Sequence, residues 1–345
     1  MRKAIILLLT VAVVGPAPAF AQGEVHKVGT TAANFLNLEV GARAVALAGA
    51  FTALANDASA LKWNPAGLSF FDRLTVTYHN VNLYADIKHQ FVGVVIPTGS
   101  NNVFGVALDY VDLGKIEKTT VESPDGTGLF FSSYDMAVSL SYSRMLTDRV
   151  TFGVTGRYVH EQIWQEKADG YCGDLGLLFT PGLSGLRVGM SITNFGPNMT
   201  MDEGPLQTFS YEPRPDQPGV GNRNLDAKFM VDDYPMPIGF QMGMVLDLVG
   251  PNAFLAKSPS NRLTWVFEVN DAFDNPMRAK YGLEYEWRRT LALRAGYKQK
   301  YDLATFSFGG GLRLPLGGMN VSFDYALADY GDLGSVHVTS VEIGF

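Results

Sequence analysis

The sequence predicts an all-β membrane protein: an antiparallel transmembrane β-barrel of about fourteen strands with an N-terminal hatch, or plug, that contains short helices. Three observations lead to this fold class. Apolar and polar residues alternate along most of the chain, which is typical of strands with one dry and one wet face. The alternating segments are about ten residues long, as a tilted strand crossing a bilayer requires. The start of the chain also resembles that of an exported protein.

Residues 1–21 have the features of a secretory signal peptide. Arg2 and Lys3 precede an apolar run, and the sequence AFA at positions 19–21 supplies the small residues of a cleavage site. We therefore expect the mature chain to begin near Gln22. The apolar run is shorter than the roughly 20 residues that a helix needs to cross a bilayer, and no later run reaches that length, so no transmembrane helix is expected.

Composition narrows the possible function classes. The 345 residues carry a formal net charge of -7, with no basic footprint for nucleic acid. The single cysteine, Cys172, cannot form an internal disulfide. The histidines lack the spacing of a metal site, and there is no glycine-flanked serine with histidine partners, so we expect no cofactor, no metal and no enzymatic activity. The histidines are His26, His79, His89, His160 and His337.

Residues 22–72 are predicted to form the hatch. This segment does not alternate, and it is rich in small residues. Its end, DASALKWNPAGL, suggests a short helix with Asn56 or Asp57 as the N-cap, which Pro65 stops after Asn64. A compact segment of small residues directly before the first strand is well placed to fold into the lumen and to pack closely against the inner wall.

Residues 73–345 are predicted to form the barrel. In RAKYGLEYEW, at 278–287, every second residue is apolar and the others are charged or glycine. A soluble β-sandwich would also alternate. Segment length, aromatic residues near the segment ends and glycines on the polar face favour the membrane barrel. On this basis Leu283 faces lipid and Glu284 the lumen, so Glu284→Arg should cost much less stability than Leu283→Arg.

The alternating segments give an even number of strands and a topology. Short connections such as TGSN, LTDR, PGLSG, WRRT and PLGG are assigned to the periplasm, and the long ones at 114–131 and 195–234 to the outside. The connection at 250–261 is long although it falls in the periplasmic set, which a miscounted strand would explain. We expect strands near 73–79, 88–96, 102–112, 132–145, 149–161, 170–180, 185–194, 236–248, 261–270, 277–288, 290–300, 303–314, 318–328 and 335–345.

The hatch segment carries a family resemblance. NFLNLEVGARAVALAGAFTALANDASALKWNPAGL, at 34–68, resembles the N-terminal signature of the PorV/PorQ family of outer-membrane proteins. Its DASALKWNPAGL portion is similar to the hatch of the broader FadL-type group of channels for hydrophobic compounds. The resemblance implies a fourteen-stranded barrel with an N-terminal plug in a bacterial outer membrane. It also implies that the assembly machinery for outer-membrane barrels recognises the terminal Phe345.

Two sets of residues are candidates for the functional site. In the channel group the Asn-Pro-Ala of the hatch takes part in the permeation path, and Asn64, Pro65 and Ala66 match it, followed by Gly67. The alternative is a structural turn in which the Asn side chain satisfies backbone groups. The inward charges form either a mutually paired lumen network or a substrate path; they are Arg157, Arg187, Lys280, Glu284, Glu286, Arg294, Arg313 and Asp324.

Two functions remain open. The first is a non-enzymatic, secretion-associated shuttle or scaffold of the type IX system, which presents its outer loops to secretion-system proteins or cargo. The alternative is a FadL-type channel through which lipophilic small molecules diffuse across the outer membrane. Polar inward faces of both signs favour the first. The partners expected in either case are outer-membrane lipid and the barrel assembly machinery, but no nucleic acid. The long loop at 195–234 is either a mobile cover or a partner-binding surface.

Overall fold

The computed structural model describes residues 29–99, 101–183, 185–201, 207–209, 225–227, 231–272, 275–301 and 303–345. The predicted signal peptide and most of the long loop at 195–234 lie outside the described residues. None of the helices in the described part of the chain is long and apolar enough to cross a membrane.

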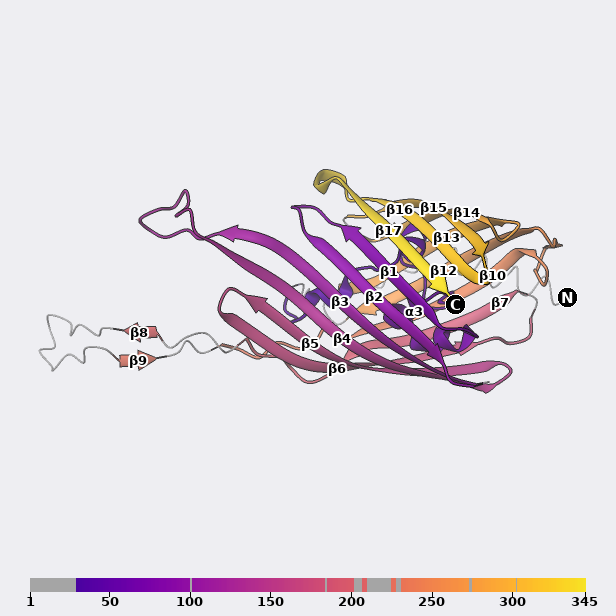
Figure 1. Cartoon of the computed structure of the whole chain (residues 1–345), viewed down its shortest axis with the longest axis horizontal. Coiled ribbons are helices and arrows are strands. Elements are labelled where there is room, and N and C mark those ends of the chain that lie inside the picture. Colours follow the sequence, from indigo (N-terminus) through magenta and orange to yellow (C-terminus); the bar gives the residue numbers. More distant parts are fainter. Residues whose placement is uncertain are drawn as a thin grey trace, which may run out of the picture.

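Within the described residues, fourteen strands form one closed antiparallel barrel, which confirms the predicted fold class (Figure 1). Neighbours in sequence pair with each other, β7 pairs with β10, and β1 pairs with β17 to close the ring. The strands are β1 (Thr75–Asn82), β2 (Lys88–Pro97), β3 (Asn102–Glu117), β4 (Phe130–Thr147), β5 (Val150–Ile163), β6 (Glu166–Phe179), β7 (Leu186–Phe195), β10 (Gly239–Gly250), β12 (Asn261–Ala272), β13 (Asn275–Trp287), β14 (Leu291–Gln299), β15 (Phe306–Leu316), β16 (Met319–Asp329) and β17 (Ser335–Gly344).

The alternation along the strands divides an outer from an inner face, as predicted. On β13, Leu283 is 42% exposed whereas Glu284 is fully buried. Aromatic side chains stack from strand to strand on the outer face, as in the row formed by Phe267, Tyr281 and Tyr297. The outer face is therefore the apolar one, and the inner face carries the polar and small residues.

The wall is higher on one side. Strands β3 to β6 have 14 to 18 residues and reach further than the others toward the left of Figure 1. The sequence placed the first of these strand ends at residue 112, but β3 continues to Glu117 and pairs with Phe130. The register shifts between Asp112 and Lys115, where Gly114 has a φ of 79°. This bulge interrupts the alternation, so the sequence pattern did not indicate that the strand continues beyond it.

The hatch segment lies inside the barrel. It contains η1 (Asn34–Asn37), α2 (Ala42–Ala46), α3 (Ala60–Trp63) and η2 (Pro65–Phe70), and its apolar residues form a core with inward side chains of the wall such as Val95 and Val266. The N-cap of α3 is Ser59 rather than Asn56 or Asp57; the Asp57 carboxylate accepts hydrogen bonds from the Ser59 N–H and hydroxyl instead.

Three short strands and one helix lie in connections. Strands β8 (Gln207–Phe209) and β9 (Leu225–Ala227) pair with each other, away from the barrel (Figure 1). Strand β11 (Ala256–Lys257) pairs in parallel with the end of β10. Helix η3 (Gly331–Leu333) lies between β16 and β17. The connections β2–β3, β4–β5, β6–β7, β10–β12, β13–β14 and β15–β16 meet at one end of the barrel, called the short-turn end below, and the others meet at the long-loop end.

Candidate functional site

The predicted hatch motif forms a buried turn against the wall. The Asn64 side chain is fully buried; its Nδ2 donates to the Thr52 carbonyl at 2.8 Å, and its Oδ1 accepts from the Ala66 N–H at 3.1 Å. Pro65 begins η2, where a missing N–H costs nothing. A Cβ atom at Gly67 would clash with the Ala55 carbonyl oxygen. All four candidate residues therefore have a structural role in closing the end of the hatch.

Glycines on the inner face of the barrel make room for the hatch. A Cβ atom at Gly153 would clash with the backbone of Pro65, and one at Gly176 would clash with the Asn64 side chain. The hatch backbone at Ala53 approaches Gly189 as closely. Further glycines in contact with the hatch lie on six other strands: Gly93, Gly105, Gly243, Gly282, Gly296 and Gly309. Together these glycines form a belt around the hatch. A larger side chain at any of these positions would push the hatch away from the barrel wall.

Side chains of the wall satisfy backbone donors of the hatch. The Ser340 and Ser307 hydroxyls accept from the N–H groups of Ala42 and Ala48 at 2.8 and 3.1 Å. The buried carboxylate of Glu268 accepts from two consecutive N–H groups, those of Phe51 and Thr52, at 3.0 and 2.8 Å. Because buried backbone groups without a partner are costly, these bonds fix the path of a segment that has little helix of its own.

Three of the predicted lumen charges meet at the hatch. Glu284 accepts from Nε and Nη2 of Arg43 in α2, each at 2.7 Å, and from Nε of Arg294 at 2.7 Å. Arg294 also donates to Asp324 at 2.6 Å. One buried carboxylate thus joins the hatch to two strands. The structure changes the expectation that Glu284→Arg is mild, because a third cation would replace the anion that two guanidinium groups share.

The other predicted charges lie in separate clusters. Arg313 pairs with Glu286 at 2.9 Å. Arg157 donates to Asp174 at 2.7 Å. Lys280 lies 3.6 Å from both Glu268 and Glu39. Among the described residues Arg187 has no carboxylate partner; it donates to the Leu54 carbonyl at 3.1 Å. Seven of the eight residues are therefore distributed over several ion-pair clusters instead of one network, and Arg187 lies apart from them.

Sequence reasoning missed the hatch's own charges. Arg43, Glu39 and Lys62 each form an ion pair with a wall residue; Lys62 binds Asp109 at 2.5 Å, and Asp109 also binds His89. Asp109 could have been found, because it lies between two apolar residues that face outward, and the alternation along the strand therefore turns its side chain inward. Nothing in the sequence indicates which wall strand each hatch charge would reach.

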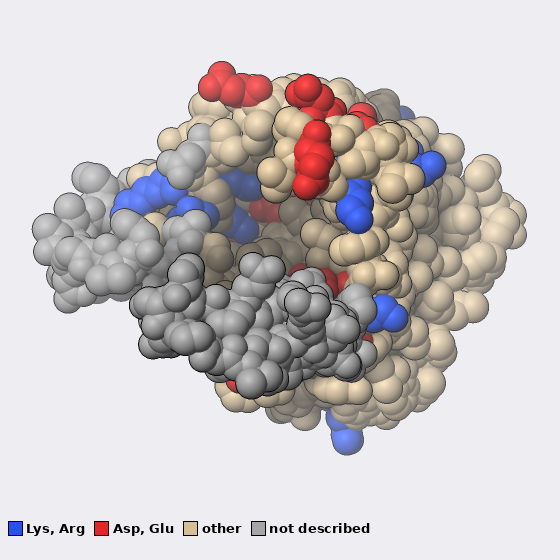
Figure 2. Space-filling model, turned by 90° about the vertical axis from the view of Figure 1, so that its left-hand side faces the viewer, with Lys and Arg blue, Asp and Glu red and all other residues tan. Residues whose placement is uncertain are grey.

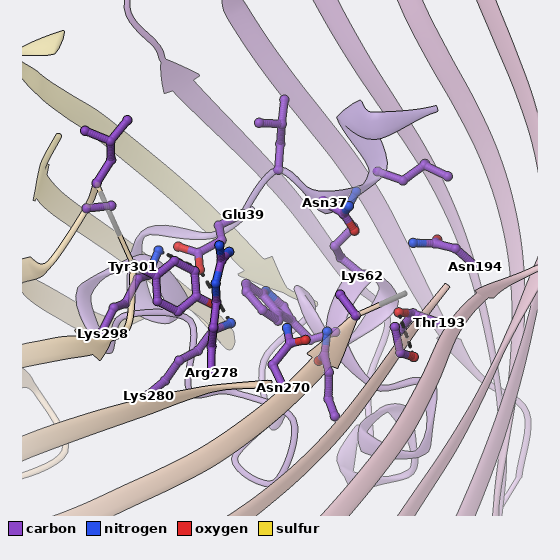
Figure 3. A pocket seen from close by; sticks show the side chains of 18 of the residues that line it. Asn37, Glu39, Lys62, Thr193, Asn194, Asn270, Arg278, Lys280, Lys298 and Tyr301 are labelled. Carbon is purple, nitrogen blue, oxygen red and sulfur yellow. Dashed lines mark hydrogen bonds and ion pairs between the residues drawn. The ribbon is translucent and has the colours of Figure 1, made fainter. Parts of the chain in front are cut away.

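A cavity of about 360 Å³ opens at the long-loop end, directly above the hatch. Figure 2 looks onto this end and shows the hollow, with Lys and Arg side chains grouped along one side of it. Figure 3 shows Arg278, Lys280, Lys298, Tyr301 and Glu39 gathered on one side of the cavity. The Glu39 carboxylate pairs with Lys298 at 2.9 Å, and the Arg278 guanidinium stacks on Tyr301 at 4.4 Å.

The charges of the hatch respond to their burial. Burial raises the pKa of the Glu39 carboxyl, but the positive charges of Lys298 and Lys280 outweigh it, so its pKa lies below the usual value. Burial lowers the pKa of the Lys62 ammonium, and the attraction of Asp109 offsets this only in part.

Within the described part of the chain, no group of three or more His, Cys, Asp or Glu side chains could hold a metal ion.

Residues 21–177 match the family model described as "Type IX secretion system protein PorV". The resemblance to the PorV/PorQ family is confirmed. No curated protein matches the chain. Among solved structures, a Pseudomonas aeruginosa FadL homologue is 12% identical, with a TM-score of 0.51, over 89% of this chain and 98% of that chain. The Pseudomonas putida toluene transporter TodX is 14% identical, with a TM-score of 0.50, over 83% and 92%.

At these identities the two solved structures establish the fold: this PorV-like chain is a FadL-like barrel. The match to the PorV family model places the protein in the outer membrane.

Proposed function

We propose that the protein is a non-enzymatic scaffold or shuttle of type IX secretion, with a lumen closed by the hatch and loops that bind secreted proteins or other components of the system. The observation that carries this proposal is the match of residues 21–177 to the PorV family model. The match covers the hatch and the strands of the higher wall, so it includes both the plug and the loops to which the proposal assigns binding.

The hatch contacts support a closed lumen. Ion pairs and backbone hydrogen bonds join the hatch to the wall on opposite sides, through Lys62 and Asp109 on β3 and through Arg43 and Glu284 on β13. A gate that opens in every transport event would have to break buried ion pairs each time, at a cost of several kcal/mol per pair. The contacts therefore favour a plug that stays in place.

The loop tips beside the higher wall support partner binding. In the connection between β3 and β4, Val121 is 96% exposed and Leu129 is 63% exposed. Phe130 and Trp164 are also exposed, and Lys118 lies over the Trp164 ring at 4.9 Å. Large apolar side chains grouped at the tips of neighbouring loops are typical of surfaces that bind another protein.

A FadL-type channel for lipophilic molecules is the second candidate. It is favoured by the cavity at the long-loop end, where Leu36, Leu38 and Trp63 lie beside the charged residues. In such a channel the Asn64 turn would lie on the permeation path, and a solute would leave the cavity by displacing the hatch.

One experiment separates the two functions. The gene is deleted in its native host and restored as wild type, as Asn64→Ala, or as the loop variant Val121→Asp with Leu129→Asp. We expect secreted proteins to accumulate in the periplasm in the deletion and the loop variant, with normal secretion in Asn64→Ala, as measured by quantitative mass spectrometry of culture medium and periplasm. Normal secretion in the deletion strain, with reduced uptake of a lipophilic probe in Asn64→Ala, would contradict the scaffold and support the channel.

A further inference from the structure

The connection between β10 and β12 is the one that the topology did not explain. The barrel has the fourteen strands that the sequence predicts, so residues 250–261 do not contain a further strand that crosses the membrane. The connection folds back over the short-turn end instead. The N–H groups of Phe254, Leu255 and Ser258 donate to the carbonyls of Asp247, Leu248 and Gly250 at 2.8, 3.0 and 3.0 Å. These bonds give the connection a fixed conformation at the short-turn end of the barrel.

The β10–β12 connection forms one side of a groove that consists of two joined chambers. Their volumes are about 330 and 460 Å³, and Asp247, Asn252 and Arg262 line both of them. The first chamber also contains Arg289 and Arg313, and the second contains Arg187. The groove lies at the opposite end of the barrel from the cavity above the hatch, because its lining comes from the β6–β7, β10–β12 and β13–β14 connections.

The groove has an excess of positive charge. Four guanidinium groups line it together with two carboxylates, those of Asp247 and Glu286. Arg262 pairs with Asp247 at 3.1 Å, and Arg313 pairs with Glu286 at 2.9 Å. Among the described residues, neither Arg187 nor Arg289 forms an ion pair, so one uncompensated guanidinium remains in each chamber.

Arg187 also lacks an acceptor for one of its donors. Its Nε is buried and has no hydrogen-bond partner, although its guanidinium lies over the Phe70 ring at 5.1 Å. A buried donor without an acceptor costs about 1–3 kcal/mol. An anionic group bound in the groove would supply that acceptor, and guanidinium groups suit carboxylates because they donate two parallel hydrogen bonds.

We propose that this groove binds an extended acidic peptide segment of a partner protein. The two uncompensated guanidinium groups lie in different chambers, which fits a ligand with two separate carboxylates better than a single compact oxyanion. Leu183 and Leu186 in one chamber and Pro251 in the other also line the groove and would contact the peptide chain. Arginine clusters are a recurrent means of binding acidic segments. The proposal is independent of the function assigned to the hatch and the loops.

The test uses the complete mature barrel in detergent and two fluorescein-labelled synthetic peptides, one of alternating Asp and Ser and one with Asn in place of each Asp. Fluorescence anisotropy gives both affinities. We expect the Asp peptide to bind at least about tenfold more tightly, since a single charged hydrogen bond is worth about that factor. Its affinity should fall as salt is raised, because part of the groove is open to solvent.

Two neighbouring arginines provide a matched pair of variants. Arg288 and Arg289 occupy the same turn with φ values of 49° and 56°, and asparagine tolerates this conformation, so both substitutions fit the backbone. Each removes one positive charge. Arg289→Asn should weaken binding of the Asp peptide roughly tenfold, the loss of about one charged hydrogen bond. Arg288→Asn should leave binding unchanged, because Arg288 lies over the Trp287 ring and does not line the groove.

Three results would overturn the proposal. The first is equal affinity for the Asp and Asn peptides. The second is an equal loss in Arg288→Asn and Arg289→Asn, which would show attraction to net charge only. The third is complete displacement of the Asp peptide by inorganic phosphate at the same concentration of anionic groups, which would show a simple oxyanion site. Arg187→Gln is a second groove variant and should also weaken binding; the Arg289→Asn comparison stands even if Arg187→Gln fails to fold.

Discussion

The middle of the lumen and its two ends are built differently. In the middle, cations meet carboxylates, and small residues let the hatch lie directly on the wall; Arg43, Glu284 and Arg294 are all buried and joined. At the ends, cavities remain and guanidinium groups such as Arg278 and Arg289 have no carboxylate partner in the described part of the chain. The difference supports the proposal that the centre closes the barrel and that binding of other molecules takes place at the two ends.

The largest expected effect comes from removing the centre altogether. Deleting residues 22–72 while keeping the signal peptide should turn a silent barrel into a conducting one, because fourteen strands enclose a lumen wide enough for solvent once the filling is gone. Single-channel recording in planar bilayers measures this. An intact protein that already conducts, with no change on deletion, would mean that the hatch does not close the lumen.

A smaller but still large effect is expected at the shared carboxylate. Glu284→Gln keeps the shape but removes the anion that Arg43 and Arg294 share, and loss of one partner in a buried ion pair costs about 3–5 kcal/mol. The control is Glu286→Gln, whose partners Arg313 and Arg262 are both partly exposed and can be solvated once the anion is gone, so its cost should be clearly smaller. Urea titration of the detergent-refolded barrel gives both free energies of unfolding, and equal costs would contradict the contrast between centre and end.

The glycine belt provides a test within one strand. Gly153→Ala places a methyl group against the backbone of Pro65, whereas Gly156→Ala on the same strand meets nothing within 4 Å. Overpacking of this kind costs about 1–3 kcal/mol. We therefore expect Gly153→Ala to lower the free energy of unfolding and to produce brief openings in the conductance record. Gly156→Ala should behave like the wild type, and openings of equal frequency in the two variants would remove the belt from the account.

The smallest expected effect is a pH dependence above the hatch. The pKa of Glu39 is lowered in the folded protein by Lys298 and Lys280, so its contribution to stability is fully present above the ordinary pKa of 4.5 and is lost as the pH falls through the lower folded value. Glu39→Gln should therefore be less stable than the wild type at pH 7, and the two should converge in strong acid. A stability difference that does not change with pH would exclude this pair as its cause.

Much of the fold could be predicted from the sequence, because barrel strands alternate with a period of two and each strand shows this pattern on its own. The bulge at Gly114 broke the pattern and hid the upper part of β3. The site was harder to predict. Parity indicated that Glu284 and Arg294 face inward, but the pairing of Glu284 with Arg43 joins residues 241 positions apart. The alternation along a strand indicates whether a side chain faces inward or outward. It contains no information about which hatch residue the side chain contacts.

Hydrogen exchange of the intact barrel tests the central claim most directly, because it measures how often each segment opens. The account predicts that peptides covering residues 42–68 exchange as slowly as those from β13 and β14, since hatch N–H groups donate to buried wall side chains such as Glu268 and Ser340. Peptides covering residues 118–129 at the loop tips should exchange within seconds. Hatch peptides that exchange as fast as the loop tips would contradict a hatch locked in place by the wall.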